Sequence, residues 1–239
     1  MPPPDAPPGP GDFLELFWAP TDVFRRRRDA GFGLPLLVLT VLFVALYYLT
    51  LPAAQAVWDA EFAKGMQQAL ADNPQLKPEQ LDAMKGVQQK FAGAIFAVSV
   101  PLIALCLGLT VWLAGSLVGA KQTFTQAANL ATLAYFPRLL EFLANAVQGV
   151  LLDDAAIAGV ESVNLGVARL LPAGSDAALL AFCGRIDLFT LWVTALIALG
   201  LVAMTKGRVR APQAWLAAGL VWFVGALPRV LPPLLRGME

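Results

Sequence analysis

The sequence predicts an all-α integral membrane protein, a bundle of five transmembrane helices with helical loops outside the membrane. Three observations lead to this class. Of the 239 residues, 58% are hydrophobic and only 14% are charged, whereas a soluble domain carries about 25% charged residues. The mean hydropathy is +0.65. Five stretches are also apolar enough to cross a hydrocarbon layer, for which a helix needs about 20 residues.

The composition also excludes several kinds of function. The chain has no histidine, which removes zinc hydrolysis through paired histidines and the Ser–His and Cys–His nucleophilic pairs. Seventeen basic and seventeen acidic residues cancel, so no net field favours nucleic acid as a partner. Cys106 and Cys183 lie too far apart to indicate a metal clip. No nucleotide-binding loop or nucleophile elbow occurs, so we expect no catalytic residue, no cofactor and no metal.

The N-terminal segment contains a proline-rich tract and then a basic cluster. Residues 1–12 are rich in Pro and Gly, which predicts a disordered, polyproline-like tail without a cleavable signal peptide. Aromatic residues follow, and Asp22 is expected to cap a short helix there. The basic cluster is Arg25, Arg26, Arg27 and Arg28. It either binds anionic headgroups, which makes membrane lipids a partner, or acts only as a topology signal.

Five spans follow, at about residues 33–56, 96–118, 128–152, 187–205 and 211–228. No charge occurs between Ala30 and Trp58, and aromatic residues near the end of this stretch suit a membrane interface. In the second span, the pair Gly115-x-x-x-Gly119 is of the type that lets a neighbouring helix approach closely. Pro212 suits the first turn of the fifth span.

The third span is interrupted by polar residues, because Arg138 and Glu141 follow directly after Pro137. At a rise of ~1.5 Å per residue, Arg138 lies ~15 Å deep, near the bilayer midplane. Glu141 is three positions further on the same helical face and is the expected partner. Asp187, at the start of the fourth span, is the second choice, ~10 Å away in depth. Such a pair either fixes helix packing or lines a pathway.

The two long connections are predicted to be helical. Residues 59–90 suit a helical hairpin that breaks at Asn73-Pro74, with an apolar stripe of helical spacing in its second half. Residues 157–171 repeat such a stripe, and Ser175 or Asp176 is expected to cap a further short helix. For orientation, the cations nearest the span ends favour a cytoplasmic N-terminus and an outside C-terminus.

Three stretches resemble bacterial members of the Yip (Ypt-interacting protein) domain family. They are 17–25 (FWAPTDVFR), Phe124-x-Gln126 with 134–137 (AYFP), and 186–192 (IDLFTLW), which includes the family-like motif of Asp187, Phe189 and Trp192. The resemblance covers residues 13–225 and implies five membrane helices with the N-terminus in the cytoplasm. Eukaryotic relatives are linked to Rab-type GTPases, but no activity follows for this chain. Arg138 and Glu141 depart from the mostly apolar family pattern.

The sequence therefore favours a non-enzymatic Yip-type protein of the bacterial inner membrane, multi-pass, with its N-terminus cytoplasmic and C-terminus outside. It acts through helix packing, lipid contact or an unidentified membrane or cytosolic protein partner. In this hypothesis the intramembrane ion pair of Arg138 and Glu141 fixes the bundle. The alternative is a small-solute or ion transporter or channel that uses Arg138, Glu141 and Asp187.

Overall fold

The computed structural model of the chain describes residues 7–172 and 175–236, and these residues are helical with short connections. The elements, in chain order, are α1 (Asp12–Glu15), α2 (Pro20–Arg26), α3 (Gly33–Thr50), α4 (Gln55–Asp72), α5 (Pro78–Leu117), α6 (Phe124–Ala134), α7 (Pro137–Leu151), η1 (Asp154–Ala156), α8 (Val160–Val163), η2 (Val167–Leu170), α9 (Ala177–Cys183), α10 (Leu188–Met204) and α11 (Ala211–Arg236).

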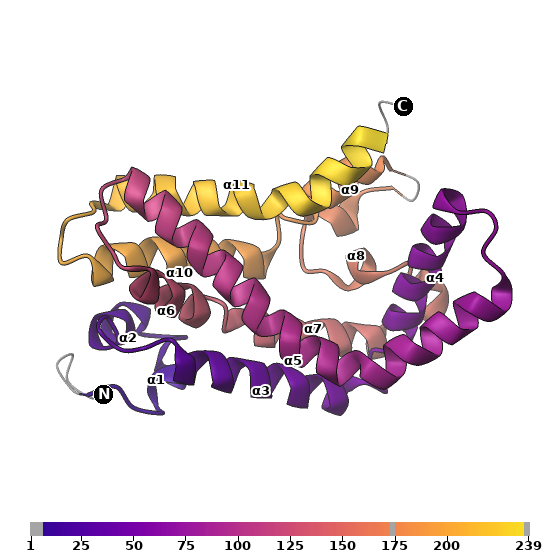
Figure 1. The fold of residues 1–239 in the computed structure, drawn as a ribbon, viewed down its shortest axis with the longest axis horizontal. Coiled ribbons are helices and arrows are strands. Elements are labelled where there is room, and N and C mark those ends of the chain that lie inside the picture. The colour runs from indigo at the N-terminus through magenta and orange to yellow at the C-terminus, as the bar shows by residue number, and fades with distance from the viewer. Residues whose placement is uncertain (1–6, 173–174, 237–239) are drawn as a thin grey trace.

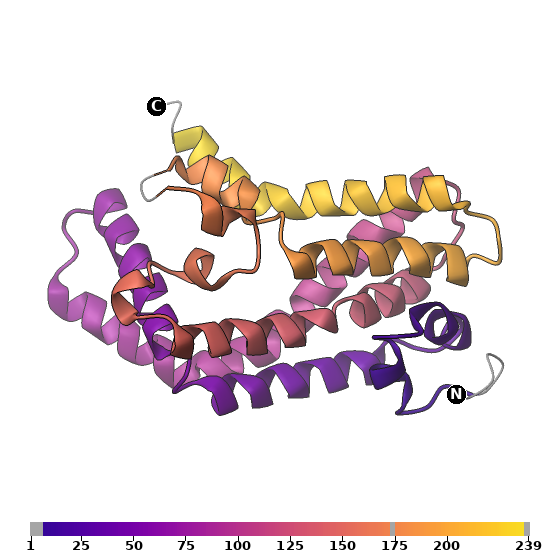
Figure 2. The same cartoon turned by 180° about the vertical axis from the view of Figure 1, so that it is seen from behind.

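The long helices run along the long axis of the molecule, and the two termini lie at opposite ends (Figure 1). Helices α1 and α2 lie at one end of the bundle, together with the turns that follow α5 and α10. The α4–α5 hairpin, α8 and α9 lie at the other end. Seen from behind, α10 lies between α11 and the α6–α7 pair, which in turn lies on α3 (Figure 2). The layers are therefore α11, α10, α6–α7 and α3, with α5 crossing them obliquely.

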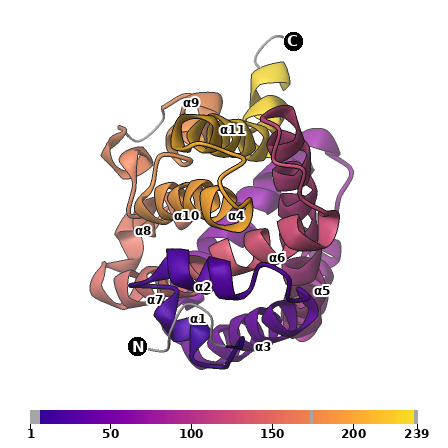
Figure 3. The same ribbon diagram turned by 90° about the vertical axis from the view of Figure 1, so that its left-hand side faces the viewer.

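Helix α6 is at the centre of the core. Every residue from Ala127 to Ala134 is buried, and the end-on view shows α2, α5 and α10 around this helix (Figure 3). A reciprocal capping box starts α6, because the Thr123 hydroxyl accepts from the amide of Gln126 at 3.2 Å and the Gln126 side chain accepts from the amide of Thr123 at 3.0 Å. The small residues of α6 allow α5 to approach closely.

Three helices are long and apolar enough to cross a membrane: α3, the Gln89–Leu117 part of α5, and α11 up to Leu235. Only 22–28% of the most apolar part of each helix is buried inside the protein. Lipid is therefore the natural cover for the remaining apolar surface of these helices. These three helices match the predicted first, second and fifth spans. Helix α10, at the predicted fourth span, is apolar but has 17 residues.

The predicted ends of the first and fifth spans differ from the structure. Helix α3, at the first span, ends at Thr50. Residues 55 and 56 already belong to α4, because a turn over 51–54 redirects the chain. Helix α11, at the fifth span, continues past Pro228 to Arg236 and has three prolines inside it.

The predicted third span, 128–152, is two helices rather than one. Helix α6 ends at Ala134 and α7 begins at Pro137. Proline has no N–H to donate to a preceding turn and suits the first turn of a helix. The sequence prediction placed Pro137 inside one span, whereas in the structure it is the first residue of α7.

The connections follow the prediction in part. The helical hairpin is present, with α4 ending at Asp72 and α5 beginning at Pro78. Asp176 caps α9 as expected, since its side chain accepts from the amide of Leu179 at 2.9 Å. The stripe over 157–171, however, is not one helix but the short α8 and η2. Gly159, with φ +144°, interrupts it before α8, because glycine adopts conformations that end a helix.

Candidate functional site

The N-terminal segment is packed onto the bundle. Residues 1–6 of the predicted tail lie outside the described residues, but Gly9 donates its amide to Asp12 at 3.0 Å, and Asp12 begins α1 and is buried. The disordered tail predicted for residues 1–12 therefore extends too far, because Gly9 and Asp12 belong to the ordered structure. Asp22 is also not the expected cap, because α2 starts at Pro20 and Asp22 instead accepts from Arg25 at 3.3 Å.

The basic cluster is divided between the interior and the surface. Arg26 contacts both Asp12 (2.7 Å) and Glu15 (2.6 Å), and Arg27 contacts Asp12 at 2.6 Å; all four side chains are at most 5% exposed. The prediction that the whole cluster faces lipid is thus wrong for Arg26 and Arg27. Their counter-ions lie 11 to 15 residues upstream, and one of them, Asp12, is the last residue of the predicted tail. Arg25 is exposed and Arg28 is half-buried.

Aromatic contacts join the N-terminal segment to the second and third of the stretches that carry the family resemblance. Phe13 stacks on Phe136 with ring centroids 5.2 Å apart. Phe17 meets the edge of Trp192 at 5.8 Å, and Phe189 is buried in the core. Aromatic pairs at such separations stabilise contacts beyond the area that they bury. The family-like motif around Trp192 therefore holds the N-terminal segment against α6 and α10.

A polar cluster surrounds Arg138 in the first turn of α7. Its guanidinium donates to Glu141, the predicted partner, and to the hydroxyl of Thr190 on α10 at 2.6 Å. Asp187 lies 3.9 Å from the same guanidinium, so the prediction of a wide separation in depth was wrong. That estimate assumed one straight third span, whereas the break before Pro137 brings Arg138 level with the start of α10. The two helices are thus joined through one arginine.

Asp187 is the N-cap of α10. One of its carboxylate oxygens accepts from the amides of Phe189 (2.9 Å) and Thr190 (2.8 Å), and the other accepts from the Thr190 hydroxyl. The short bridge between Gly166 and Asp187 fixes the backbone on the preceding side. Since an N-cap side chain satisfies amides that the helix leaves free, Asp187 already has a full set of partners.

Two further arginines complete the cluster, and the sequence reasoning missed both as site residues. Arg185 precedes α10 and Arg229 lies on α11, and both line a cavity of about 190 Å³ with Arg138 and Glu141. Within the described residues, neither guanidinium has a carboxylate or another acceptor at bonding distance, and the Nε atom of Arg185 is buried without a partner.

This small cavity, which we call cavity B, adjoins two larger ones. Cavity A, about 730 Å³, lies among α4, α5, α7 and α8 and shares Tyr135, Glu141 and Arg229 with cavity B. Cavity C, about 480 Å³, lies among α5, α10 and α11 and shares Tyr135, Arg138 and Arg185 with cavity B. Phe43 of α3 also lines cavity B.

The predicted Gly115-x-x-x-Gly119 pair does not serve a neighbouring helix. A Cβ atom on Gly115 would lie 2.4 Å from the side chain of Gln122, in the turn after α5. Gly119 lies beyond the helix with φ +81°. The close helix contact is at Gly108, where a Cβ would come within 2.9 Å of the Ala128 backbone on α6. Glycine pairs indicate close approach, but in this chain the close approach uses a different glycine.

Comparison with known protein families identifies one match that covers most of the chain. The Yip1 domain matches residues 14–229, a range that runs from α1 into α11 and includes the whole polar cluster. No curated protein and no solved structure matches the chain. The predicted resemblance is confirmed at the level of the domain, and the match fits a membrane protein with several apolar helices. The chain therefore belongs to the Yip1 domain family.

Proposed function

We propose that this Yip1 domain protein is a non-enzymatic, five-crossing membrane protein that acts by binding a lipid or a protein partner in or at the membrane. The bond network of Arg138 carries the proposal, because one guanidinium on α7 bonds to Glu141 of the same helix and to Thr190 of α10. An ionisable group among apolar helices persists where it is paired and faces the protein or a cavity. Its partners here are both bundle residues, which supports a role in holding a binding scaffold together.

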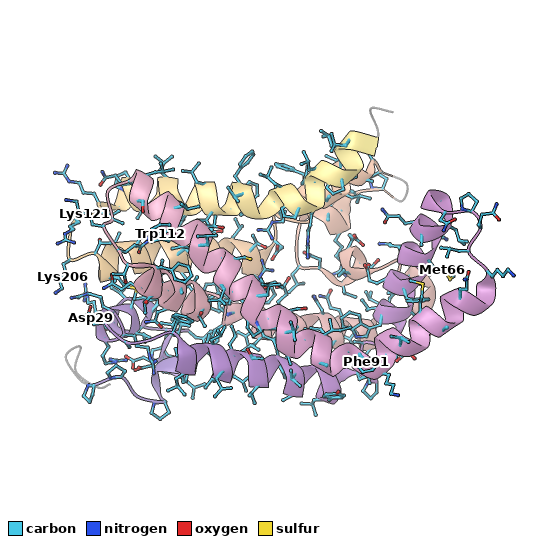
Figure 4. All side chains as sticks on the ribbon, in the orientation of Figure 1. Asp29, Met66, Phe91, Trp112, Lys121 and Lys206 are labelled. Carbon is cyan, nitrogen blue, oxygen red and sulfur yellow. The ribbon has the colours of Figure 1, made fainter. Side chains whose placement is uncertain are left out.

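Five crossings follow if α10 and the α6–α7 pair span the membrane in addition to α3, α5 and α11. Helices α6 and α7 contain 11 and 15 residues, and together they are long enough at ~1.5 Å per residue. Lys121, Lys206 and Asp29 lie at the end of the bundle that holds α1 and α2 (Figure 4). This basic end supports a cytoplasmic N-terminus and an outside C-terminus in a bacterial inner membrane.

Arg25 and Arg28 remain candidates for contact with anionic lipid, because Arg25 is exposed and Arg28 half-buried. Neutralising this surface pair should weaken binding to anionic vesicles without unfolding the protein. The same change at Arg26 should unfold the N-terminal segment, since it leaves Asp12 and Glu15 with one fewer buried counter-ion.

The packing role is tested by breaking and then removing the ion pair. Glu141→Gln should lower stability, and the double variant Arg138→Met with Glu141→Leu should restore much of it, since well-packed apolar pairs often replace buried ion pairs without loss. Stability is measured by denaturant unfolding in detergent micelles. A double variant that folds well but loses association with the membrane partner would support binding through this cluster. A double variant no more stable than Glu141→Gln would contradict the packing role.

The alternative, permeation of a small solute or an ion, is favoured by one observation: Arg138 lines both cavity B and cavity C. A cavity at the opposite end, lined by residues such as Asp12, Glu15 and Trp18, shares no lining residue with cavities A, B and C. This arrangement supports a pocket rather than a passage. Flux through liposomes that changes in Glu141→Gln at unchanged abundance would instead support transport.

A further inference from the structure

We infer that cavities B and C together form a binding site for an anionic phospholipid, with the phosphate among Arg138, Arg185 and Arg229 and an acyl chain in cavity C. The inference rests on the proposed binding function and names the ligand class. It concerns a different surface from the N-terminal basic cluster.

Two guanidinium groups of the cluster have no bonded counter-ion within the described residues, those of Arg185 and Arg229. The nearest carboxylates of the cluster are already bonded, Glu141 to Arg138 and Asp187 to the first turn of α10, and Glu161 acts on Arg229 only at longer range. A half-buried charge without a bonded partner, such as that of Arg185, is costly, so it favours an anion from outside the chain.

Two N–H groups of the cluster have no bonding partner. The Nε atoms of Arg138 and Arg185 are buried and have no partner within the described residues. Arg229 is exposed and lines cavity B from α11. Arginine presents several N–H groups in a planar fork that fits phosphate oxygens, and such bonds are stronger than neutral ones. Three arginines from three separate elements suit a tetrahedral group with several oxygens.

Gly225 on α11 makes room for the Arg185 guanidinium. A Cβ atom there would lie only 3.1 Å from its terminal nitrogen, Nη2. The Arg185 carbonyl also accepts from the indole of Trp222 at 3.0 Å, which fixes the start of the side chain against α11. The cation is thus held in place beside the cavity before any ligand arrives, and preorganised groups bind with a smaller entropic loss.

Cavity C has the shape and chemistry of a slot for an acyl chain. Its volume, about 480 Å³, falls in the range of small-molecule sites. Most of its lining is apolar, and its charged residues are Arg138 and Arg185. On the α5 and α11 sides it is lined by residues that are exposed on the outside of the bundle, among them Leu102, Ile103 and Val224. A lipid can therefore enter sideways from the bilayer.

This side entrance distinguishes a lipid from a soluble anion. A soluble phosphate would gain only the arginine contacts, whereas the chain of a phospholipid already lies in the bilayer beside cavity C and can pack against its apolar lining. Basic pockets between transmembrane helices are a known type of site for anionic headgroups. The arginines of cavity B and the apolar lining of cavity C adjoin each other, which favours a ligand with a phosphate group and an apolar chain.

The test is native mass spectrometry of the full chain in neutral detergent, titrated with phosphatidylglycerol, with phosphatidylcholine of the same acyl chains, and with inorganic phosphate. We expect saturable binding of one phosphatidylglycerol, weaker binding of phosphatidylcholine, and no binding of inorganic phosphate at the same concentrations. Arg185→Gln and Arg229→Gln should each weaken phosphatidylglycerol binding about tenfold or more, the usual effect of losing one bond to a charged group. Arg169→Gln, the matched control, removes an exposed arginine bonded only to Gln148 and should bind as the wild type does.

A second pair of variants tests the chain slot. Cys106 is exposed and lines cavity C, so Cys106→Trp should fill the slot and weaken phosphatidylglycerol binding, while Leu113→Trp on another part of α5 should not. Equal binding of the two lipids, unchanged binding in Arg229→Gln, or unchanged binding in Cys106→Trp would overturn the inference. So would saturation by inorganic phosphate alone. Because Arg229 is exposed, its variant decides the question even where Arg185→Gln fails to fold. The ion-pair test at Arg138 and Glu141 is independent of these results.

Discussion

Replacing Asp187 by alanine should destabilise the protein more than any other single cap substitution in the described residues. The change removes an acceptor for the amides of Phe189 and Thr190 and for the Thr190 hydroxyl. It also removes one of the two carboxylates near Arg138. These groups lie in the interior, where water does not replace the lost partners.

The magnitude follows from the contacts. Loss of an N-cap costs about 1 kcal/mol, and the loss of a buried bond to a charged group costs about 1.5–3 kcal/mol. We therefore expect Asp187→Ala to lower the free energy of unfolding by about 2–4 kcal/mol. Asp187→Asn keeps an oxygen acceptor for the two amides and loses the charge, so its cost should be about 1 kcal/mol.

Unfolding in mixed micelles of a mild detergent and dodecyl sulfate, followed by far-ultraviolet circular dichroism, measures these differences. The matched control is Asp176→Ala, because Asp176 caps α9 through one amide and has no guanidinium beside it. It should cost only about 1 kcal/mol. If Asp187→Ala costs no more than Asp176→Ala, the carboxylate does not link α10 to Arg138 energetically, and our account of the cluster is wrong.

Two further predictions concern packing and pH. Gly108→Leu should destabilise the protein by about 1–3 kcal/mol through overpacking, because even a Cβ would clash with the backbone of Ala128; Gly219→Leu, with open space around it, should be nearly neutral in the same unfolding assay. Burial acts to raise the pKa of Glu161, but the hydrogen bond from Lys64 prevails and the net pKa is lowered. A carboxylate with a lowered pKa stabilises the fold above its unfolded pKa of ~4.3 and loses that effect as the pH falls through its folded pKa. Loss of the contact between α4 and α8 at acid pH should therefore increase the rate at which a protease cleaves these two helices in the wild type. In Glu161→Gln, this cleavage rate should not depend on pH. An equal acid response in both would show that another group controls this contact.

The helical class and most helix positions follow from local patterns. Uninterrupted apolar runs predict α3, the apolar half of α5, and α11, because a helix in a membrane satisfies its own backbone groups. Asp176 before an apolar stretch predicts the start of α9, and Asn73-Pro74 predicts the break in the hairpin. These signals depend only on neighbouring residues, so one sequence is enough to read them.

The buried N-terminal ion pairs could not be predicted in the same way. Arg26 and Arg27 form part of a run of four arginines, which is typical of an exposed basic segment. Of their partners, Asp12 ends a segment whose prolines and glycines are typical of a tail, and Glu15 follows three residues later. The available signal was charge balance, because two acidic residues stand close before the arginines. It does not by itself say which arginines turn inward.

The polar cluster was predicted in part for a geometric reason. Glu141 lies one turn from Arg138 on the same helix, so local spacing was sufficient. Arg185 and Arg229 approach from other elements, and nothing in their neighbours marks them as members of one site. One sequence signal was available: both arginines adjoin apolar spans, and neither has an Asp or Glu three or four residues away to pair with. Depth estimates failed at Asp187 because they require straight helices.

Helix α5 has 40 residues, which makes it ~60 Å long at ~1.5 Å per residue. It is one element from the tip of the extramembrane hairpin to the far end of the bundle, and Pro101, near its middle, removes one backbone bond and is a natural point of bending. The residues that form one side of cavity C follow directly after this proline. A movement of the hairpin in the aqueous phase would therefore reach the wall of cavity C through one helix, which can bend at Pro101.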